Sequence, residues 1–96
     1  MAPLYSIAKN IEKKIKEQLK PHFFKIINES DQHAHHAQKP EGSETHFALK
    51  IVSDDFEGKS RVERQRYVYQ ILDEEIKAGV HALSLRLYTP EEASHR

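Results

Sequence analysis

Hydrophobic residues recur at helical spacing in two stretches of this chain. In residues 3–19, five apolar positions share one face: Leu4, Ala8, Ile11, Ile15 and Leu19. In residues 61–78, the expected buried stripe continues past the helix end: Val62, Tyr69, Leu72, Ile76 and Val80. Apolar side chains spaced three and four residues apart lie on one side of a helix, so each stretch predicts an amphipathic helix.

Capping and breaking residues mark where these helices begin and end. Pro21 ends the first helix because proline has no backbone N–H and its ring clashes with a continuing helix. Ser60 and Glu63 have the spacing of a capping box, which satisfies free backbone N–H groups at a helix start. Gly79 stands where a left-handed helix stop costs little.

Three segments have the composition or the alternation of β-strands. Residues 23–29 are rich in aromatic and β-branched side chains. Residues 46–53 and the segment after Gly79 alternate, with these side chains directed inward: Phe47, Leu49, Ile51, Leu83, Leu85 and Leu87. In the turn at residues 54–58, Phe56 is expected to fill the space beneath it.

The predicted order is α-β-β-α-β, a small α/β (α+β) fold. The first two strands should pair antiparallel, and a right-handed helical crossover makes the second and third parallel. This gives a three-stranded mixed sheet with both helices on one face. We expect a single domain over residues 1–96, with a flexible loop at about 30–45 and a frayed tail at about 90–96.

Composition removes several classes of function. The 15 basic and 15 acidic residues cancel, which argues against a dedicated nucleic-acid binder, since such proteins usually carry a basic surface. No cysteine is present, so the chain supplies neither a disulfide nor a sulfur ligand. No apolar run could span a bilayer, and no secretory or transit signal precedes the first helix. We therefore expect no membrane association and an intracellular protein, in the bacterial cytoplasm or the mitochondrial matrix.

Seven histidines are many for 96 residues and provide the candidate chemistry. His81 lies at a helix-to-strand junction, where its ring can face outward. A second group lies in the loop: His33, His35 and His36. The alternatives are a structural His81 bonded to nearby backbone, and solvated loop histidines with adventitious affinity for zinc, nickel or copper. His46 is a weaker candidate, and His22 and His95 are the weakest.

Basic residues crowd the start of the second helix: Lys59, Arg61, Arg64 and Arg66. They are candidates for binding an acidic partner surface or the carboxylates of glutathione. The alternative is ordinary variation of a solvated surface. An enzyme is not expected, because no convincing carboxylate–histidine arrangement is present.

Six segments of the chain, in order, resemble the BolA family. They are Glu29-Ser30, Gly42-Ser43-Glu44-Thr45-His46-Phe47, Phe56-Glu57-Gly58, Arg64-Gln65-Arg66-Tyr67-Val68-Tyr69, Val80-His81-Ala82-Leu83 and Tyr88-Thr89-Pro90-Glu91-Glu92. Two features depart from the family pattern: Gln65 stands where the family usually has histidine, and the loop before Pro40 is longer and has three histidines.

The resemblance implies a class II KH-like fold and a non-enzymatic partner of a monothiol glutaredoxin. The two proteins would share a 2Fe–2S cluster, with glutathione supplied by the partner and no cofactor bound by this chain alone, in iron–sulfur cluster trafficking, maturation or iron regulation. His81 and one of His33, His35 and His36 would be the ligands, His33 being the family-like choice. A homodimer of the apoprotein is a further expectation.

Ligand chemistry agrees with that implication. Two histidines can replace two cysteines on one iron of a 2Fe–2S centre, but the remaining ligands are thiolates. A chain without cysteine can therefore supply only half of such a site. The alternative is a KH-like nucleic-acid-binding transcriptional regulator. KH domains hold the backbone with a Gly-x-x-Gly loop, and the three glycines here, Gly42, Gly58 and Gly79, cannot form one.

Overall fold

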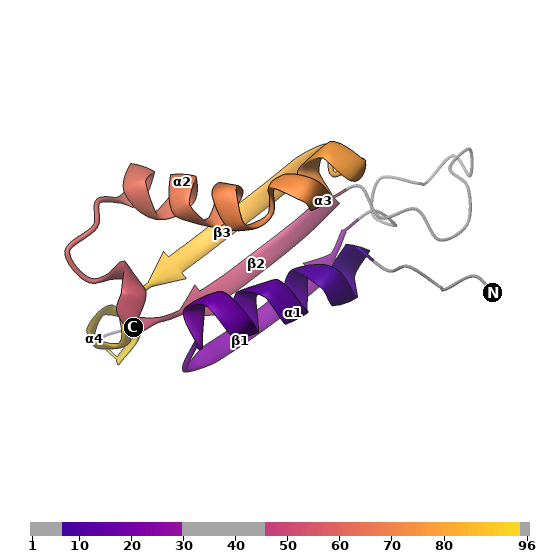
Figure 1. The fold of residues 1–96 in the computed structure, drawn as a ribbon. Coiled ribbons are helices and arrows are strands. Elements are labelled where there is room, and N and C mark those ends of the chain that lie inside the picture. Colours follow the sequence, from indigo (N-terminus) through magenta and orange to yellow (C-terminus); the bar gives the residue numbers. More distant parts are fainter. Residues whose placement is uncertain (1–6, 30–45, 95–96) are drawn as a thin grey trace.

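The computed structural model describes residues 7–29 and 46–94 (Figure 1). The first half contains α1 (Ile7–Leu19), β1 (Phe23–Asn28) and β2 (His46–Val52). A 3₁₀ turn (Asp54–Phe56) leads into α2 (Arg61–Ile71), α3 (Asp73–Ala78), β3 (Ala82–Tyr88) and α4 (Pro90–Ser94). The predicted loop at about 30–45, with His33, His35 and His36, lies outside the described residues, as do Leu4 and His95.

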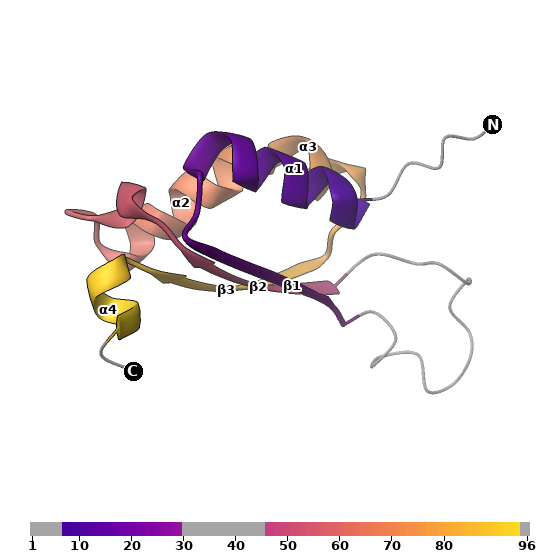
Figure 2. The same ribbon diagram turned by 90° about the horizontal axis from the view of Figure 1, so that it is seen from below.

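The three strands form one mixed sheet in the order β1-β2-β3. β1 pairs antiparallel with β2, and β2 pairs parallel with β3, as the sequence predicted. Figure 2 shows α1, α2 and α3 together on one face of the sheet, while the opposite face is left open along most of its length. The predicted α-β-β-α-β succession and the three-stranded mixed sheet are confirmed, with the second helix divided into α2 and α3 and with α4 added after β3.

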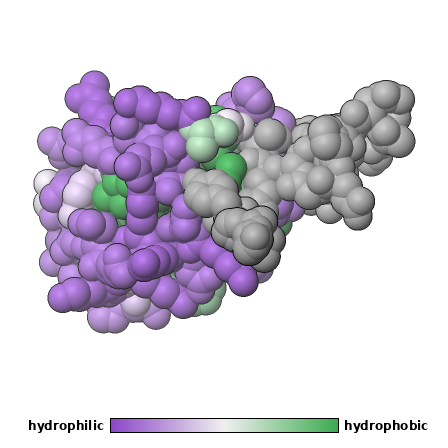
Figure 3. Space-filling model, turned by 45° about the vertical axis from the view of Figure 1, so that its right-hand side comes forward, coloured by the Kyte–Doolittle hydropathy of each residue, from purple (hydrophilic) through white to green (hydrophobic). Residues whose placement is uncertain are grey.

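The hydrophobic core lies between these helices and the sheet. Its buried members come from every layer: Ile11, Ile15, Leu19, Phe47, Leu49, Ile51, Phe56, Val68, Leu72 and Val80. The inward alternation of β2 is confirmed, as is Phe56 beneath the turn, where its side chain is fully buried. Outside the core, the surface in Figure 3 is largely hydrophilic, with small apolar patches. None of the described helices combines the length and apolar character needed to cross a membrane.

The buried face of α2 differs from the prediction. Val62 and Tyr69 were expected in the core but are 55% and 43% exposed. The face that packs inward instead contains Arg64 and Val68 and continues to Leu72. Arginine counts as polar in a hydrophobic pattern, so a buried, ion-paired Arg64 shifts the apparent stripe toward the wrong side of the helix.

The predicted second helix is divided at Leu72, whose φ and ψ of −99° and 19° separate α2 from α3. On α3, three residues after this break, the side chain of Glu75 is only 2% exposed. Lys14 on α1 donates to Glu75 Oε1 at 3.0 Å and to Glu74 Oε1 at 2.8 Å. The hydrogen bonds that Lys14 donates to the Glu74 and Glu75 carboxylates raise the pKa of Lys14, and the bond with Lys14 lowers the pKa of Glu74. Lys14 thus joins α1 to α3.

The frayed tail expected from Pro90 onward is wrong, because residues 90–94 form α4. Thr89 and Glu92 make a reciprocal cap: Glu92 N–H donates to Thr89 Oγ1 at 3.1 Å, and Thr89 N–H donates to Glu92 Oε1 at 2.9 Å. The Thr-x-x-Glu spacing is the sequence signature of a capping box, so the signal for this helix was present in the sequence.

Candidate functional site at the histidine end of the sheet

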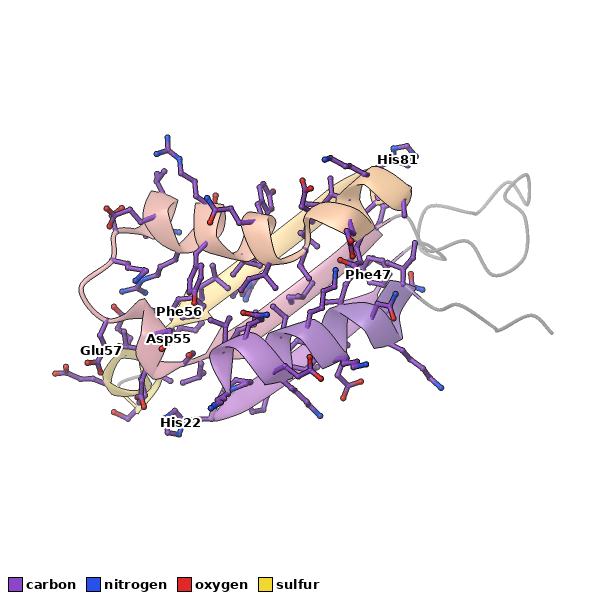
Figure 4. The ribbon with its side chains drawn as sticks, in the orientation of Figure 1. His22, Phe47, Asp55, Phe56, Glu57 and His81 are labelled. Carbon is purple, nitrogen blue, oxygen red and sulfur yellow. The ribbon has the colours of Figure 1, made fainter. Side chains whose placement is uncertain are left out.

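His81 projects from the short connection between α3 and β3. Gly79 ends α3 with a φ of 138°, a backbone conformation that glycine adopts without a Cβ penalty. Its neighbour Val80 is buried at 8% exposure and fixes the connection to the core. His81 itself is exposed and points away from the body of the molecule (Figure 4). A rigid backbone therefore presents a solvent-accessible imidazole.

A second histidine ring lies beside that of His81. The His46 and His81 ring centroids are 6.4 Å apart, with an interplanar angle of 46°. Parallel pairing causes this proximity, because His46 at the start of β2 is in register with Ala82, the residue after His81. From the sequence, His46 was only a weak candidate for a metal ligand. Its proximity to His81 depends on the register between β2 and β3, which the sequence does not reveal.

The segment with the remaining candidate histidines is attached at the same end of the sheet. The residues that flank it, Glu29 and His46, are hydrogen-bonded to each other: Glu29 N–H donates to His46 O at 2.7 Å. His33 is four residues beyond Glu29, and a fully extended chain spans at most about 14 Å over that length. His33, His35 and His36 themselves lie outside the described residues. The two residues that flank this segment are therefore held at the end of the sheet where His46 and His81 lie.

The described residues contain two neighbouring imidazoles but no complete set of metal ligands. No group of three or more His, Cys, Asp or Glu side chains arranged to hold a metal occurs within residues 7–29 and 46–94. His46 and His81 bring two imidazoles to the same end of the sheet, and imidazole nitrogen is a ligand type that iron, zinc and copper accept. His22 is separate from them: it lies at the opposite end of the molecule (Figure 4), where its Nε2 is 3.2 Å from Asp54 Oδ1.

Arg64, one of the predicted partner-binding residues, is turned inward and is 9% exposed. Its Nε donates to Lys59 O and one of its terminal nitrogens to Leu87 O, both at 3.0 Å. Two further bonds at 2.7 and 3.0 Å bind both carboxylate oxygens of Glu92. This hydrogen bonding occupies the guanidinium within the fold, so its assignment to a partner-binding surface is corrected to a structural role.

The other predicted basic residues remain near the start of α2. Arg61 and Arg66 are exposed, and Lys59 Nζ lies 5.4 Å from the centroid of the Tyr67 ring. α2 and α3 together extend over residues 61–78, up to about 27 Å at 1.5 Å per residue. His81 follows the far end of this pair (Figure 4). The basic cluster and the histidine pair are therefore two separate surfaces.

Replacing Glu92 with glutamine should make the free energy of unfolding less dependent on pH under acidic conditions. The Arg64 guanidinium, helped by the Thr89 N–H, lowers the pKa of Glu92 from 4.5 to about 2. The folded-state pKa is depressed, so this contribution is complete above about pH 4.5 and is lost as the pH falls toward about 2. Urea unfolding at a series of pH values measures it. The difference between wild type and E92Q should shrink across that window, whereas a constant difference would contradict the prediction.

Comparison with known proteins gives a consistent result. The family model described as BolA-like protein matches residues 15–92. A DNA-binding transcriptional regulator BolA from Haemophilus influenzae is 48% identical over 87 residues, covering 91% of this chain and 81% of that protein.

Two solved structures have the same fold as this chain. The BolA domain of SufE1 from Arabidopsis thaliana superimposes with a TM-score of 0.81 at 45% identity, covering 93% of this chain and 98% of that one. BolA1 from Mus musculus superimposes with a TM-score of 0.80 at 36% identity, covering 99% of this chain and 74% of that one.

Proposed function

The chain belongs to the BolA-like family, and we propose that it acts as the histidine-donating partner of a monothiol glutaredoxin, with which it shares a 2Fe–2S cluster. The cluster is cargo that the pair holds for iron–sulfur trafficking, maturation or iron regulation. The protein performs no catalysis in this role. His81 supplies one ligand, and the glutaredoxin and its glutathione supply the thiolates.

One observation carries this proposal: an exposed His81 with a second imidazole 6.4 Å away, in a chain that has no cysteine. Two nitrogen donors can complete one iron of a 2Fe–2S centre, while thiolates must complete the other. The missing thiolates favour a shared cluster over one that this chain holds alone. The exposed position of His81 leaves its ring accessible to a second protein.

The second ligand is either His46 or a histidine of the 30–45 segment. His46 is favoured by its position beside His81. His33 is favoured by its place in the family-like pattern and by the short chain length from Glu29. Single substitutions of His33, His35, His36 and His46 distinguish these candidates, because only loss of the true ligand should reproduce the effect of losing His81.

The direct test mixes the wild-type protein with a cluster-loaded monothiol glutaredoxin and records visible absorption and circular dichroism. We expect both spectra to change as imidazole replaces part of the cluster's original ligand set. The apo-glutaredoxin provides the control for protein association without a cluster. Spectra equal to the sum of the separate components, under conditions where the two proteins bind, would refute cluster sharing while leaving a cluster-free complex.

A second candidate function is DNA-binding transcriptional regulation, which the name of the Haemophilus influenzae relative favours. The exposed Arg61 and Arg66 on α2 would contact duplex phosphates in that case. Titrating a promoter-length duplex at increasing salt tests it. A preference for one sequence that persists at high salt would support regulation, whereas binding that vanishes steeply with salt for every sequence would indicate electrostatic contact alone.

A further inference from the structure

The sheet has a second face that the helices do not cover. α1, α2 and α3 pack on the opposite side, and α4 lies beyond the end of β3 (Figure 2). Side chains alternate along each strand, so the residues between the core positions point to this open face. On β1 they include Phe23 and Ile27, which are 46% and 40% exposed. These are two of the large apolar side chains that the described structure leaves in solvent.

Three cations form a row across the open face. The register pairs Lys25 with Lys50 and Lys50 with Arg86, so the row includes one residue from each strand. Neighbouring strands lie about 4.8 Å apart, which makes the row about 10 Å long at the backbone. Like charges placed opposite one another destabilise a sheet. Within the part of the chain that the structure describes, no carboxylate forms an ion pair with any of the three.

Aromatic rings hold the middle cation in place. Lys50 Nζ lies 5.6 Å from the centroid of the Phe23 ring and 5.8 Å from that of Tyr88. Such contacts attract an ammonium group to the ring face. Phe23 and Tyr88 flank the same β2 residue, Val52, in the register, so the two rings stand on either side of the central strand. The row of cations therefore lies beside an aromatic pair.

A hollow of about 390 Å³ adjoins the row on its other side. Ala48 and Ser84 are paired in the register and contribute small side chains to it, while Ile27 and Glu29 also line it. Its volume falls within the range of about 300–1,000 Å³ typical of small-molecule sites. Its lining combines the three cations with the Ser84 hydroxyl and the single Glu29 carboxylate, so positive charge predominates and the hollow suits a nucleotide unit with a flanking phosphate.

We propose that this open face binds single-stranded nucleic acid, with Lys25, Lys50 and Arg86 contacting backbone phosphates and Phe23 stacking on a base. Single-strand binding surfaces combine a basic path for the backbone with aromatic rings for the bases. An unpaired strand is favoured over a duplex, because only unstacked bases expose the faces that an aromatic ring can contact. This surface does not include His81 and is independent of cluster sharing.

Fluorescence anisotropy with labelled 12-nucleotide rU and dT oligomers tests the assignment. Three phosphate contacts predict a slope of log affinity against log salt of about −2, since each contributes about −0.7 for single strands. The double variant K50Q/R86Q should reduce the slope to about −0.7 and the affinity by roughly tenfold or more at low salt. The control K13Q removes an exposed charge on α1 and should leave both unchanged. Equal losses in K13Q would overturn the proposed surface.

Two further measurements separate nucleic acid from other polyanions. F23A should weaken binding by about tenfold through lost stacking without changing the salt slope, and an unchanged affinity would refute the stacking role. A labelled 12-residue poly-glutamate peptide and a 12-base-pair duplex provide the competing classes. Binding of either as tightly as the oligomers would overturn the single-strand assignment. Circular dichroism of each variant checks that the fold is retained.

Discussion

His81→Ala is expected to remove most of the spectral change that wild-type protein produces with a cluster-loaded monothiol glutaredoxin. The imidazole of His81 is exposed and is held on a short connection between Gly79 and Ala82. No cysteine in the chain could replace it as a ligand. Visible absorption and circular dichroism measure the loss directly, because both report on the ligands of the cluster.

The matched control is His22→Ala. His22 is also an exposed histidine, but it lies at the opposite end of the molecule beside Asp54 (Figure 4). It should leave the spectra at the wild-type level. Substituting His46 shows whether the ring 6.4 Å from His81 is the second ligand. If His81→Ala still gave the full wild-type spectrum, the assignment of His81 as a ligand would be wrong.

Arg64→Ala is expected to lower the free energy of unfolding by about 3 kcal/mol. The substitution removes four hydrogen bonds, two to backbone carbonyls and two to the Glu92 carboxylate. It also leaves the Leu87 and Lys59 carbonyl oxygens without this donor, and unsatisfied polar groups are costly when buried. The contacts join α2, β3 and α4, so the loss should affect the whole domain. Urea or thermal unfolding measures it.

Arg61→Ala is the control for charge, because Arg61 is exposed on the same helix. Its effect should remain within about 0.5 kcal/mol, as for most surface substitutions. Arg64→Lys tests the geometry of the contact, because lysine keeps the charge but cannot make the bidentate contact with Glu92. Its free energy of unfolding should lie between those of wild type and Arg64→Ala. Similar stabilities for Arg64→Ala and Arg61→Ala would show that the buried ion pair contributes little.

Regular local patterns in the sequence determined most of the fold. The alternation around Phe47, Leu49 and Ile51 predicted the inner face of β2, because side chains of a strand point to opposite sides. The Ser60 and Glu63 capping box, confirmed by reciprocal bonds of 2.8 and 3.1 Å, fixed the start of α2. These features depend on residues close in the chain, and a sequence records such relations directly.

Contacts between distant residues were decided only by the tertiary structure. A hydrophobic pattern places arginine outside, yet Arg64 is buried because Glu92, 28 residues later, folds back to pair with it. His46 meets His81, and Lys25, Lys50 and Arg86 align, because of the strand register. Register follows from how whole strands pack against the core, and a shift of one residue would turn every side chain to the other face. The sequence therefore supplied the chemical groups, and the sheet determined which of them lie together.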